Sequence, residues 1–236
     1  MSDLSIVILT FNSQKYLREV LKSAQFANEV VVVDSGSNDD TLAICAKFEN
    51  VRVLKQSWLG FGAQKQYGVD NAKFEWIFVL DSDEVITNEL KTELLDELRS
   101  PKFKAYKVAR LNYFFGKSIK SMGLYPDFSV RFFNKNYAKF DGREIHEKVV
   151  LNDKDGNFGI LKNHFIHYAY DSVEQFINKQ NRYSSLGAKK NTLKAIFNPF
   201  WTFFKLFILK GGFKDGWRGY VIARLYAQYT FWKYIK

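Results

Sequence analysis

Four short and almost entirely apolar segments in the first hundred residues are each followed at once by polar residues. They are residues 4–9, 29–33, 51–54 and 75–80. Continuous apolar runs of this length are typical of strands that are buried on both faces of a parallel sheet. Segments with helical periodicity separate them, so strands and helices alternate along the chain. The sequence therefore predicts an α/β fold, with a parallel sheet joined by right-handed crossovers.

The remaining segments have less regular patterns, but helices and strands can still be predicted from them. Helices are predicted around residues 17–24, 41–48, 64–72 and 88–99, and further strands at residues 105–112 and 129–134. From residue 172 onward the pattern is helical and rich in aromatic residues and lysine. No apolar stretch reaches the ~20 residues that a membrane-spanning helix needs.

Polar residues gather where three of the predicted strands end. Thr10 and Asn12 follow the first strand, Asp34 follows the second, and the cluster Asp81-Ser82-Asp83-Glu84 follows the fourth. Ligands of open α/β sheets bind beyond the carboxyl ends of the strands. The positions of these residues therefore predict one ligand site at that edge of the sheet.

The acidic cluster has the donor atoms that a divalent cation prefers. Carboxylate oxygens bind Mg²⁺ and Mn²⁺ and leave coordination positions open for phosphate. Such a cation stabilises the negative charge of a departing diphosphate. A short acidic motif by itself is more often a solvated turn, here one that caps the helix expected at Asn88. Its place at the end of a buried strand favours a metal and diphosphate site, with Asp81 and Asp83 as ligands.

Two further segments suit the recognition of a nucleotide. The Asp34 carboxylate can accept hydrogen bonds from a base or a ribose, although an aspartate in this place also forms turns without any ligand. Residues 60–65 form a glycine-containing loop that leads into a helix and ends at Lys65. Backbone N–H groups at a helix start and the Lys65 ammonium favour phosphate or ribose contacts, but a lone Gly-x-Gly is a weak signal.

Transfer of a group to a hydroxyl also needs a base that deprotonates the hydroxyl. Two polar segments among aromatic residues supply candidates, Tyr125-Pro126-Asp127 and residues 143–147. Asp127 and Glu147 are the carboxylates considered, and the pattern leaves both open. His167 is one of three histidines in the chain, and a lone histidine is more often a structural hydrogen-bonding residue than a ligand.

These motifs together resemble glycosyltransferase family 2, the inverting enzymes of GT-A fold. The resemblance is carried by residues 5–12, 31–41 and 80–84. Further motifs are similar to the branch that contains the bacterial lipopolysaccharide-core β-1,4-glucosyltransferases: residues 58–65, Tyr125-Pro126-Asp127, residues 131–133, His146-Glu147 and residues 181–184. The resemblance runs to about Ala188 and is specific to the fold and the reaction class, not to the sugar.

The resemblance implies a role for each matching position in the donor site. Asp34 would contact the nucleotide base, and Thr10 and Asn12 would line the nucleotide pocket. Lys65 would lie beside the donor. Arg131, which follows Asp127, would also bind the nucleotide sugar.

The resemblance also implies the metal ligands and the base. Asp81 would hold the ribose or a metal-bound water, Asp83 would ligate Mg²⁺ or Mn²⁺, and His167 would be a further metal ligand. Asp127 occupies the place of the family's base. A proline stands before it where the family has a second acid, so Glu147 stays an alternative.

The C-terminal quarter carries the positive charge of the chain. Residues 172–236 hold twelve Lys or Arg and two acidic residues, whereas the remaining 171 residues hold 23 of each sign. Residues 200–209 are apolar on nearly all sides of a helix. Three interpretations fit: a helix in the interface of an anionic membrane, an oligomer interface such as a homodimer's, and plain packing with a solvated lysine face. Nucleic-acid binding is not expected, because the acidic site would repel phosphodiesters.

With the resemblance, the expected fold is a GT-A-type, Rossmann-like, mostly parallel sheet flanked by helices, with a helical, aromatic and basic C-terminal extension. The expected domains are a catalytic domain at residues 1–171 and the extension at residues 172–236. Within the first, residues 1–100 would form a nucleotide-sugar half and residues 101–171 an acceptor half.

The expected function is metal-dependent, inverting transfer of a sugar from a nucleoside diphosphate to a lipopolysaccharide or other cell-envelope glycan. Uridine is favoured over guanosine in the donor. The enzyme would be cytoplasmic and peripherally attached to the inner face of the cytoplasmic membrane. The alternatives are a nucleotide-sugar-binding scaffold without catalysis and a nucleotidyltransferase. The latter normally has a glycine-rich, basic N-terminal loop, which residues 10–13 lack.

Overall fold

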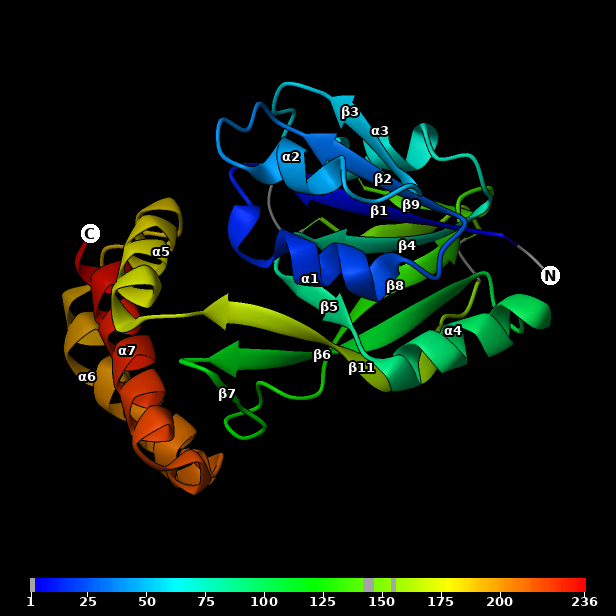
Figure 1. The fold of residues 1–236 in the computed structure, drawn as a ribbon. Coiled ribbons are helices and arrows are strands. Elements are labelled where there is room, and N and C mark those ends of the chain that lie inside the picture. The colour runs from blue at the N-terminus through cyan, green and yellow to red at the C-terminus, as the bar shows by residue number, and fades with distance from the viewer. Residues whose placement is uncertain (1–2, 142–146, 154–155) are drawn as a thin grey trace. The chain divides into compact units, whose positions relative to one another are not determined.

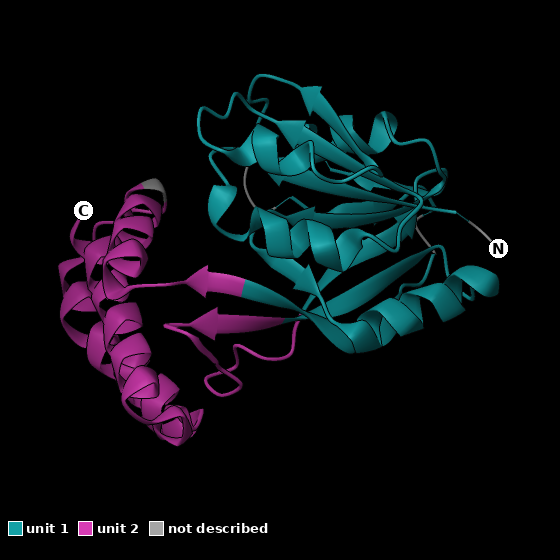
Figure 2. Ribbon diagram, viewed as in Figure 1, with its two compact units in different colours: residues 1–110, 128–167 teal, residues 111–127, 168–236 magenta. Residues whose placement is uncertain are grey.

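The computed structural model describes residues 3–141, 147–153 and 156–236. This part of the chain forms two compact units (Figure 2), one of Met1–Arg110 with Phe128–His167 and one of Leu111–Asp127 with Tyr168–Lys236. The second unit thus takes in residues 111–127, which lie inside the predicted acceptor half. The physical reason is that Ile119 and Met122 are buried in the same apolar cluster as Phe176 and Ile222 of the helical region.

A parallel arrangement of four strands forms the centre of the first unit (Figure 1). The order is β3 (Val51–Lys55), β2 (Glu29–Asp34), β1 (Leu4–Thr10) and β4 (Trp76–Asp81). Every residue of β1 and β2 is buried, which explains their continuously apolar sequences. The predicted α/β fold, a mostly parallel central sheet flanked by helices, is confirmed.

The sheet continues beyond β4 with strands of mixed direction. In order they are β8 (Asp127–Asn134), which pairs antiparallel with β4, then β6 (Ala105–Phe114), β11 (Gly159–Tyr170) and β5 (Glu84–Ile86). The short β7 (Lys117–Ser118) pairs with β6, and β9 (Ala138–Phe140) pairs with β10 (Val149–Leu151) in a separate two-stranded sheet. The strand β11 was not predicted, because Asn163, His164 and His167 interrupt its apolar pattern.

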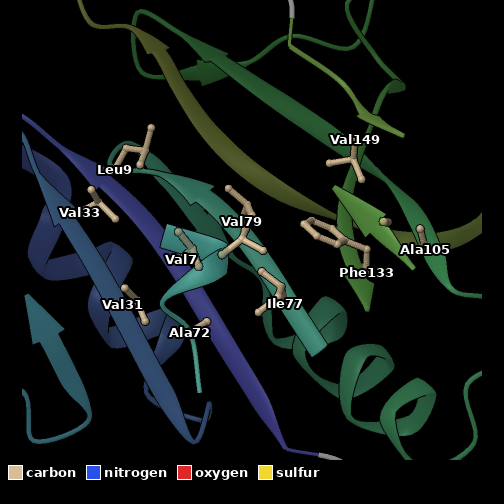
Figure 3. Packing of buried hydrophobic residues seen from close by; sticks show 12 residues of the cluster. Val7, Leu9, Val31, Val33, Ala72, Ile77, Val79, Ala105, Phe133 and Val149 are labelled. Atoms are coloured by element: carbon tan, nitrogen blue, oxygen red, sulfur yellow. The ribbon is translucent and has the colours of Figure 1, made fainter. Parts of the chain in front are cut away.

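Four helices lie in the described residues of the first unit: α1 (Gln14–Ala24), α2 (Thr41–Cys45), α3 (Phe61–Asp70) and α4 (Asn88–Arg99). The first helix buries its predicted apolar stripe, and α4 begins at Thr87, whose side chain accepts a hydrogen bond from the backbone N–H of Leu90. On α3, a Cβ at Gly68 would collide with Val7 and Val33, so glycine there lets the helix approach the sheet closely. Figure 3 shows the core beneath, with Val7, Val31 and Val33 of the parallel strands.

The second unit contains the remaining helices, α5 (Val173–Leu186), α6 (Thr192–Phe204) and α7 (Gly216–Ile235). A π-helical segment, η1 (Lys205–Leu209), continues α6, and a short 3₁₀ helix, η2 (Gly212–Asp215), leads into α7. A Cβ at Gly219 of α7 would collide with the backbone carbonyl of Gly212, so α7 packs directly on the turn before it. No helix in the described part of the chain has both the length and the apolar content needed to cross a membrane.

Candidate active site

The carboxyl ends of β1, β2 and β4 meet at one edge of the sheet, as predicted. In the strand register Thr10 lies beside Asp34, and Leu9 lies beside Asp81. The Thr10 hydroxyl donates a hydrogen bond to Asp34 Oδ1 at 3.0 Å, and both side chains are buried. The three strand ends therefore border one site within the first unit.

Asp34 is held as a carboxylate by the turn that follows β2. Its Oδ2 accepts hydrogen bonds from the backbone N–H groups of Gly36 and Ser37, at 3.0 and 2.9 Å, and the Ser37 hydroxyl donates to its Oδ1. Burial raises the pKa of Asp34, but the hydrogen bonds from Ser37, Gly36 and Thr10 outweigh it and keep the pKa below its ordinary value. The carboxylate is therefore charged and fixed in direction.

A pocket of about 290 Å³ opens beside this turn. Its lining comes from two loops: Asp34, Ser35, Gly36, Ser37, Leu42, Lys55, Gln56 and Ser57. The buried Gln64, which had no predicted role, joins these loops by donating from Nε2 to Ser35 Oγ at 3.0 Å and to the Gln56 carbonyl at 3.1 Å. Another pocket, of about 370 Å³ between α1, β5 and α4, contains none of the predicted site residues. Of these two pockets, the one at Asp34 is thus the one lined by a predicted site residue.

Thr10 and Asn12, which the resemblance assigns to the nucleotide pocket, are not among the residues that line this cavity. They hold the residues that do. Asn12 has a φ of +48°, a left-handed conformation that asparagine tolerates better than most residues. Its backbone N–H donates to Ser37 Oγ at 2.9 Å, and its side-chain Oδ1 accepts from the backbone N–H of Asn38 at 2.9 Å. The loops after β1 and β2 are thereby tied to each other.

Lys65 connects two carboxylates that are distant in the sequence. Its side chain is only 6% exposed, and its Nζ lies 3.1 Å from Asp81 Oδ1 and 2.8 Å from Glu147 Oε1. Lysine is almost never buried unless it is paired. A single ammonium group thus joins the acidic cluster after β4 to one of the two candidate bases.

Arg131 approaches Asp81 from β8 and is itself buried. Its NH2 group lies 2.7 Å from Glu84 Oε1 and 3.5 Å from Asp81 Oδ2. The fully buried Glu84 also accepts a hydrogen bond from the backbone N–H of Asp81 at 2.8 Å. Glu84 was noted in the acidic cluster but had no predicted role of its own. Glu84 thus holds Arg131 and the Asp81 backbone, while the Asp81 carboxylate itself contacts Lys65 and Arg131.

The two cations determine the charge state of Asp81. Burial raises the pKa of Asp81, but Lys65 and Arg131 outweigh it and hold the pKa well below its usual range. Burial likewise lowers the pKa of Arg131, and Glu84 and Asp81 outweigh this effect and raise it. Asp81 is therefore held as an anion between the Lys65 and Arg131 side chains.

Asp83 and His167 form a second pair beside this cluster. His167 Nε2 lies 3.6 Å from Asp83 Oδ2, and the pairing of β11 with β5 places His167 opposite Glu84. A carboxylate oxygen and an imidazole nitrogen suit a cation such as Mn²⁺. Among the residues the structure describes, no group of three or more His, Cys, Asp or Glu side chains is arranged to hold a metal ion. The pair fits a cation that takes its other ligands from phosphate oxygens and water.

The two candidate bases fall in different units. Glu147 lies in the first unit, in contact with Lys65, whereas Asp127 begins β8 and belongs to the second unit. His146, part of the motif that contains Glu147, lies outside the described residues. Of the two carboxylates, Glu147 is the one that the first unit itself connects to Asp81.

Comparisons with known proteins point to one family. The sequence model described as Glycosyl transferase family 2 matches residues 5–169. The lipopolysaccharide core biosynthesis glycosyltransferase LpsC of Rhizobium meliloti (strain 1021) is 28% identical over 97% of this chain and 89% of that protein. An uncharacterized glycosyltransferase of Rickettsia typhi is 29% identical over 96% of this chain and 84% of its own length.

A solved structure shares the fold. The crystal structure of Staphylococcus aureus TarS 1–349 in complex with UDP superposes with a TM-score of 0.52 at 20% identity, over 91% of this chain and 75% of that chain. At this identity the likeness shows the fold alone. Because the family model matches well over half of the chain, and every predicted site residue from Thr10 to His167 lies within the match, the chain belongs to glycosyl transferase family 2 and is a glycosyltransferase.

Proposed function

We propose that this glycosyltransferase moves a sugar, with inversion at the anomeric carbon, from a nucleoside diphosphate to a glycan of the cell envelope. The observation that carries the proposal is the connection of Asp81 to Lys65 and Arg131 and, through Lys65, to Glu147. This connection brings together the parts that the reaction needs: an acidic cluster for a metal, two cations for a diphosphate, and a carboxylate base.

The donor binds along the edge of the sheet. The nucleoside occupies the pocket at Asp34, where a carboxylate held by Ser37 and Gly36 accepts hydrogen bonds from the base or ribose. The diphosphate extends toward Lys65 and Arg131, whose charges stabilise the phosphate oxygens as the sugar leaves. A uridine donor is favoured over guanosine, and the crystallisation of TarS with UDP on the same fold supports this choice.

A divalent cation, Mg²⁺ or Mn²⁺, completes the diphosphate site. Asp83 and His167 would be its protein ligands, and Asp81 would hold it directly or through a water molecule. When bound there, the cation would neutralise charge on the departing diphosphate. The Asp83 side chain is 37% exposed, so a cation can reach this pair from solvent.

We assign the base to Glu147, with Asp127 as the alternative. In an inverting transfer the base takes the proton of the acceptor hydroxyl. The hydroxyl oxygen then bonds to the anomeric carbon while the bond from that carbon to the diphosphate oxygen breaks on the opposite side. The 2.8 Å contact with Lys65 keeps Glu147 beside the proposed diphosphate site.

The acceptor is a lipopolysaccharide core or a related envelope glycan, a proposal supported by the name of the relative LpsC. A lipid-anchored acceptor would place the reaction at the cytoplasmic face of the cytoplasmic membrane, with the enzyme attached peripherally.

The test measures transfer from a panel of nucleotide sugars, with Mn²⁺, Mg²⁺ or a chelator, for the normal chain and for Asp83→Ala. We expect Asp83→Ala or chelation to lower the transfer rate by about a hundredfold or more. Asp96→Ala, which removes an exposed carboxylate on α4, serves as the control and should leave the rate unchanged. Near-normal transfer by Asp83→Ala would overturn the metal site.

A thermal-shift panel with the same donors tests binding separately. A donor that binds only the folded chain raises its midpoint of unfolding. We expect a shift with a UDP-sugar that grows when Mn²⁺ or Mg²⁺ is added. If no nucleotide sugar shifts the midpoint in either metal, the proposed donor site is wrong.

A further inference from the structure

The second unit has a continuous apolar face that its own core leaves exposed. This face lies on α6 and η1, which follow each other without a break. Eight large side chains, each between 45% and 73% exposed, make it up: Leu193, Ile196, Phe197, Phe200, Trp201, Phe204, Ile208 and Leu209. We call them the α6 face. Their spacing of mostly three or four residues puts them on one side of the helix.

The opposite side of α6 is already used for packing. Ala195 is buried, the Phe203 and Phe207 rings stack with 5.4 Å between centroids, and Thr202 Oγ1 lies 3.3 Å from Thr230 Oγ1 of α7. The unit therefore folds without using the α6 face. An apolar surface of this extent is rare on a free monomer and marks contact with a partner.

The charge around the α6 face indicates which partner it meets. Between Glu174 and Asp215 the chain has eight Lys or Arg and no Asp or Glu. Lys194, Lys205 and Lys210 lie in or directly after α6 and η1, and all three are exposed. A second copy of the chain would bring another strongly basic surface against this one, which is unfavourable. A surface of anionic lipid attracts it.

The composition of the face matches the interfacial region of a bilayer. Its phenylalanines and Trp201 are residues that insert at the boundary between headgroups and acyl chains, and lysines beside them reach lipid phosphates. Phe213 and Trp217, in the segment that follows, are exposed as well. A helix with these properties lies in the plane of the interface.

We propose that the α6 face docks the protein on a membrane that contains anionic phospholipid. The aromatic side chains insert at the acyl boundary, and the flanking lysines contact the headgroup phosphates. This inference does not rest on the proposed sugar transfer, because docking needs neither the donor nor the site at Asp81.

The test is flotation of the full chain with vesicles, in the absence of any nucleotide sugar. We expect the chain to float with vesicles of phosphatidylglycerol and phosphatidylcholine in equal parts, and less with phosphatidylcholine alone. Phe200→Gln combined with Trp201→Gln should lower the bound fraction about tenfold or more, because two exposed aromatic side chains can no longer insert into the bilayer. The matched control, Trp58→Gln with Phe61→Gln, removes an exposed aromatic pair of the first unit and should bind like the normal chain.

A second pair of variants tests the charge. Lys194→Gln with Lys205→Gln should weaken binding to the anionic vesicles about tenfold and make it less sensitive to salt. Lys22→Gln with Lys47→Gln, on exposed positions of the first unit, should have no such effect. Absence of binding by the normal chain, or equal binding by the aromatic variant, overturns the proposal. A dimer in solution that the aromatic variant dissociates, without vesicle binding, would make the α6 face a contact between copies instead.

Discussion

The two units use charged and apolar residues in opposite ways. The first unit has 21 Lys or Arg and 21 Asp or Glu, whereas the second has fourteen Lys or Arg and four Asp or Glu. In the first unit, charges of opposite sign meet inside the site, as at Lys65, Asp81 and Arg131. In the second, acidic residues are too few to pair with the basic ones, so most of the charge faces outward. The first unit thus pairs its charges around the candidate site, whereas the second unit presents a basic surface.

Apolar residues show the same division. The parallel strands of the first unit are buried along their whole length, and their side chains hold the strand ends that carry the site. On α6 of the second unit one apolar side packs against α7 and the other stays exposed. Among the described residues α7 covers one side of α6, and the other side is the α6 face that we propose to dock on a membrane.

The largest effect should come from removing the proposed catalytic base of the first unit. Glu147→Gln removes the carboxylate that we propose as the base, so we expect kcat to fall by a factor of about 10²–10⁴. Donor affinity, measured by thermal shift, should change little. Asp127→Asn is the matched variant in the second unit. If Asp127→Asn alone causes the loss of kcat, the base belongs to the second unit, and both units then contribute to the reaction.

An intermediate effect should come from adding a methyl group to a tightly packed position in each unit separately. Gly68→Ala forces a methyl group against Val7 and Val33 in the first unit, and Gly219→Ala forces one against the Gly212 carbonyl in the second. Each should lower the stability of its own unit by about 1–3 kcal/mol, because a packed interior resists added volume. Hydrogen exchange measured segment by segment should show lost protection in that unit.

The control for this pair is Gly187→Ala in the second unit. A Cβ there would lie 3.5 Å from the Tyr183 carbonyl, an ordinary contact, and the backbone φ is −103°. Its stability should stay within about 0.5 kcal/mol of the normal chain. Uniform loss of protection across both units in either test variant would show that they unfold as one.

The smallest effect concerns Glu29, whose charge stabilises the fold and has no role in the proposed reaction. Glu29 accepts hydrogen bonds from Ser5 Oγ at 2.7 Å, the Lys73 backbone N–H at 2.8 Å and Arg52 NH2 at 2.8 Å. Burial raises the pKa of Glu29, but these bonds outweigh it and lower the pKa. Its charge therefore stabilises the fold above the unfolded pKa of about 4.3 and loses this effect as pH falls through the folded value.

Glu29→Gln should accordingly lower the free energy of unfolding by about 1 kcal/mol near pH 7, since the charge-assisted bonds become neutral ones. The difference between the variant and the normal chain should shrink as pH falls below about 4. Denaturant unfolding at several pH values measures it. Glu49→Gln, at an exposed position of the same unit, should show no pH-dependent difference, and a Glu29→Gln difference that grows on acidification would contradict the assigned role.

The sequence pattern predicted which residues lie close together at the ends of the parallel strands. Asp34 and Asp81 end strands on either side of β1, so the alternation of strands and helices was enough to bring them to one edge. The same pattern could not find the partners that reach the site from elsewhere. Lys65 and Glu147 are 82 residues apart, and Arg131 and Glu84 are 47 apart. No local periodicity links such pairs, because their members lie on separate elements that only the tertiary packing brings together.

The sequence by itself determined the α/β alternation, the edge where the site lies, and the basic, aromatic character of the C-terminal quarter. These properties follow from local patterns, in which a few neighbouring side chains decide whether a segment is a buried strand or a helix. The tertiary structure decided which carboxylate Lys65 holds beside Asp81 and which side of α6 stays exposed. Both depend on what packs against a residue from distant parts of the chain, and burial of that kind is not encoded in any single segment.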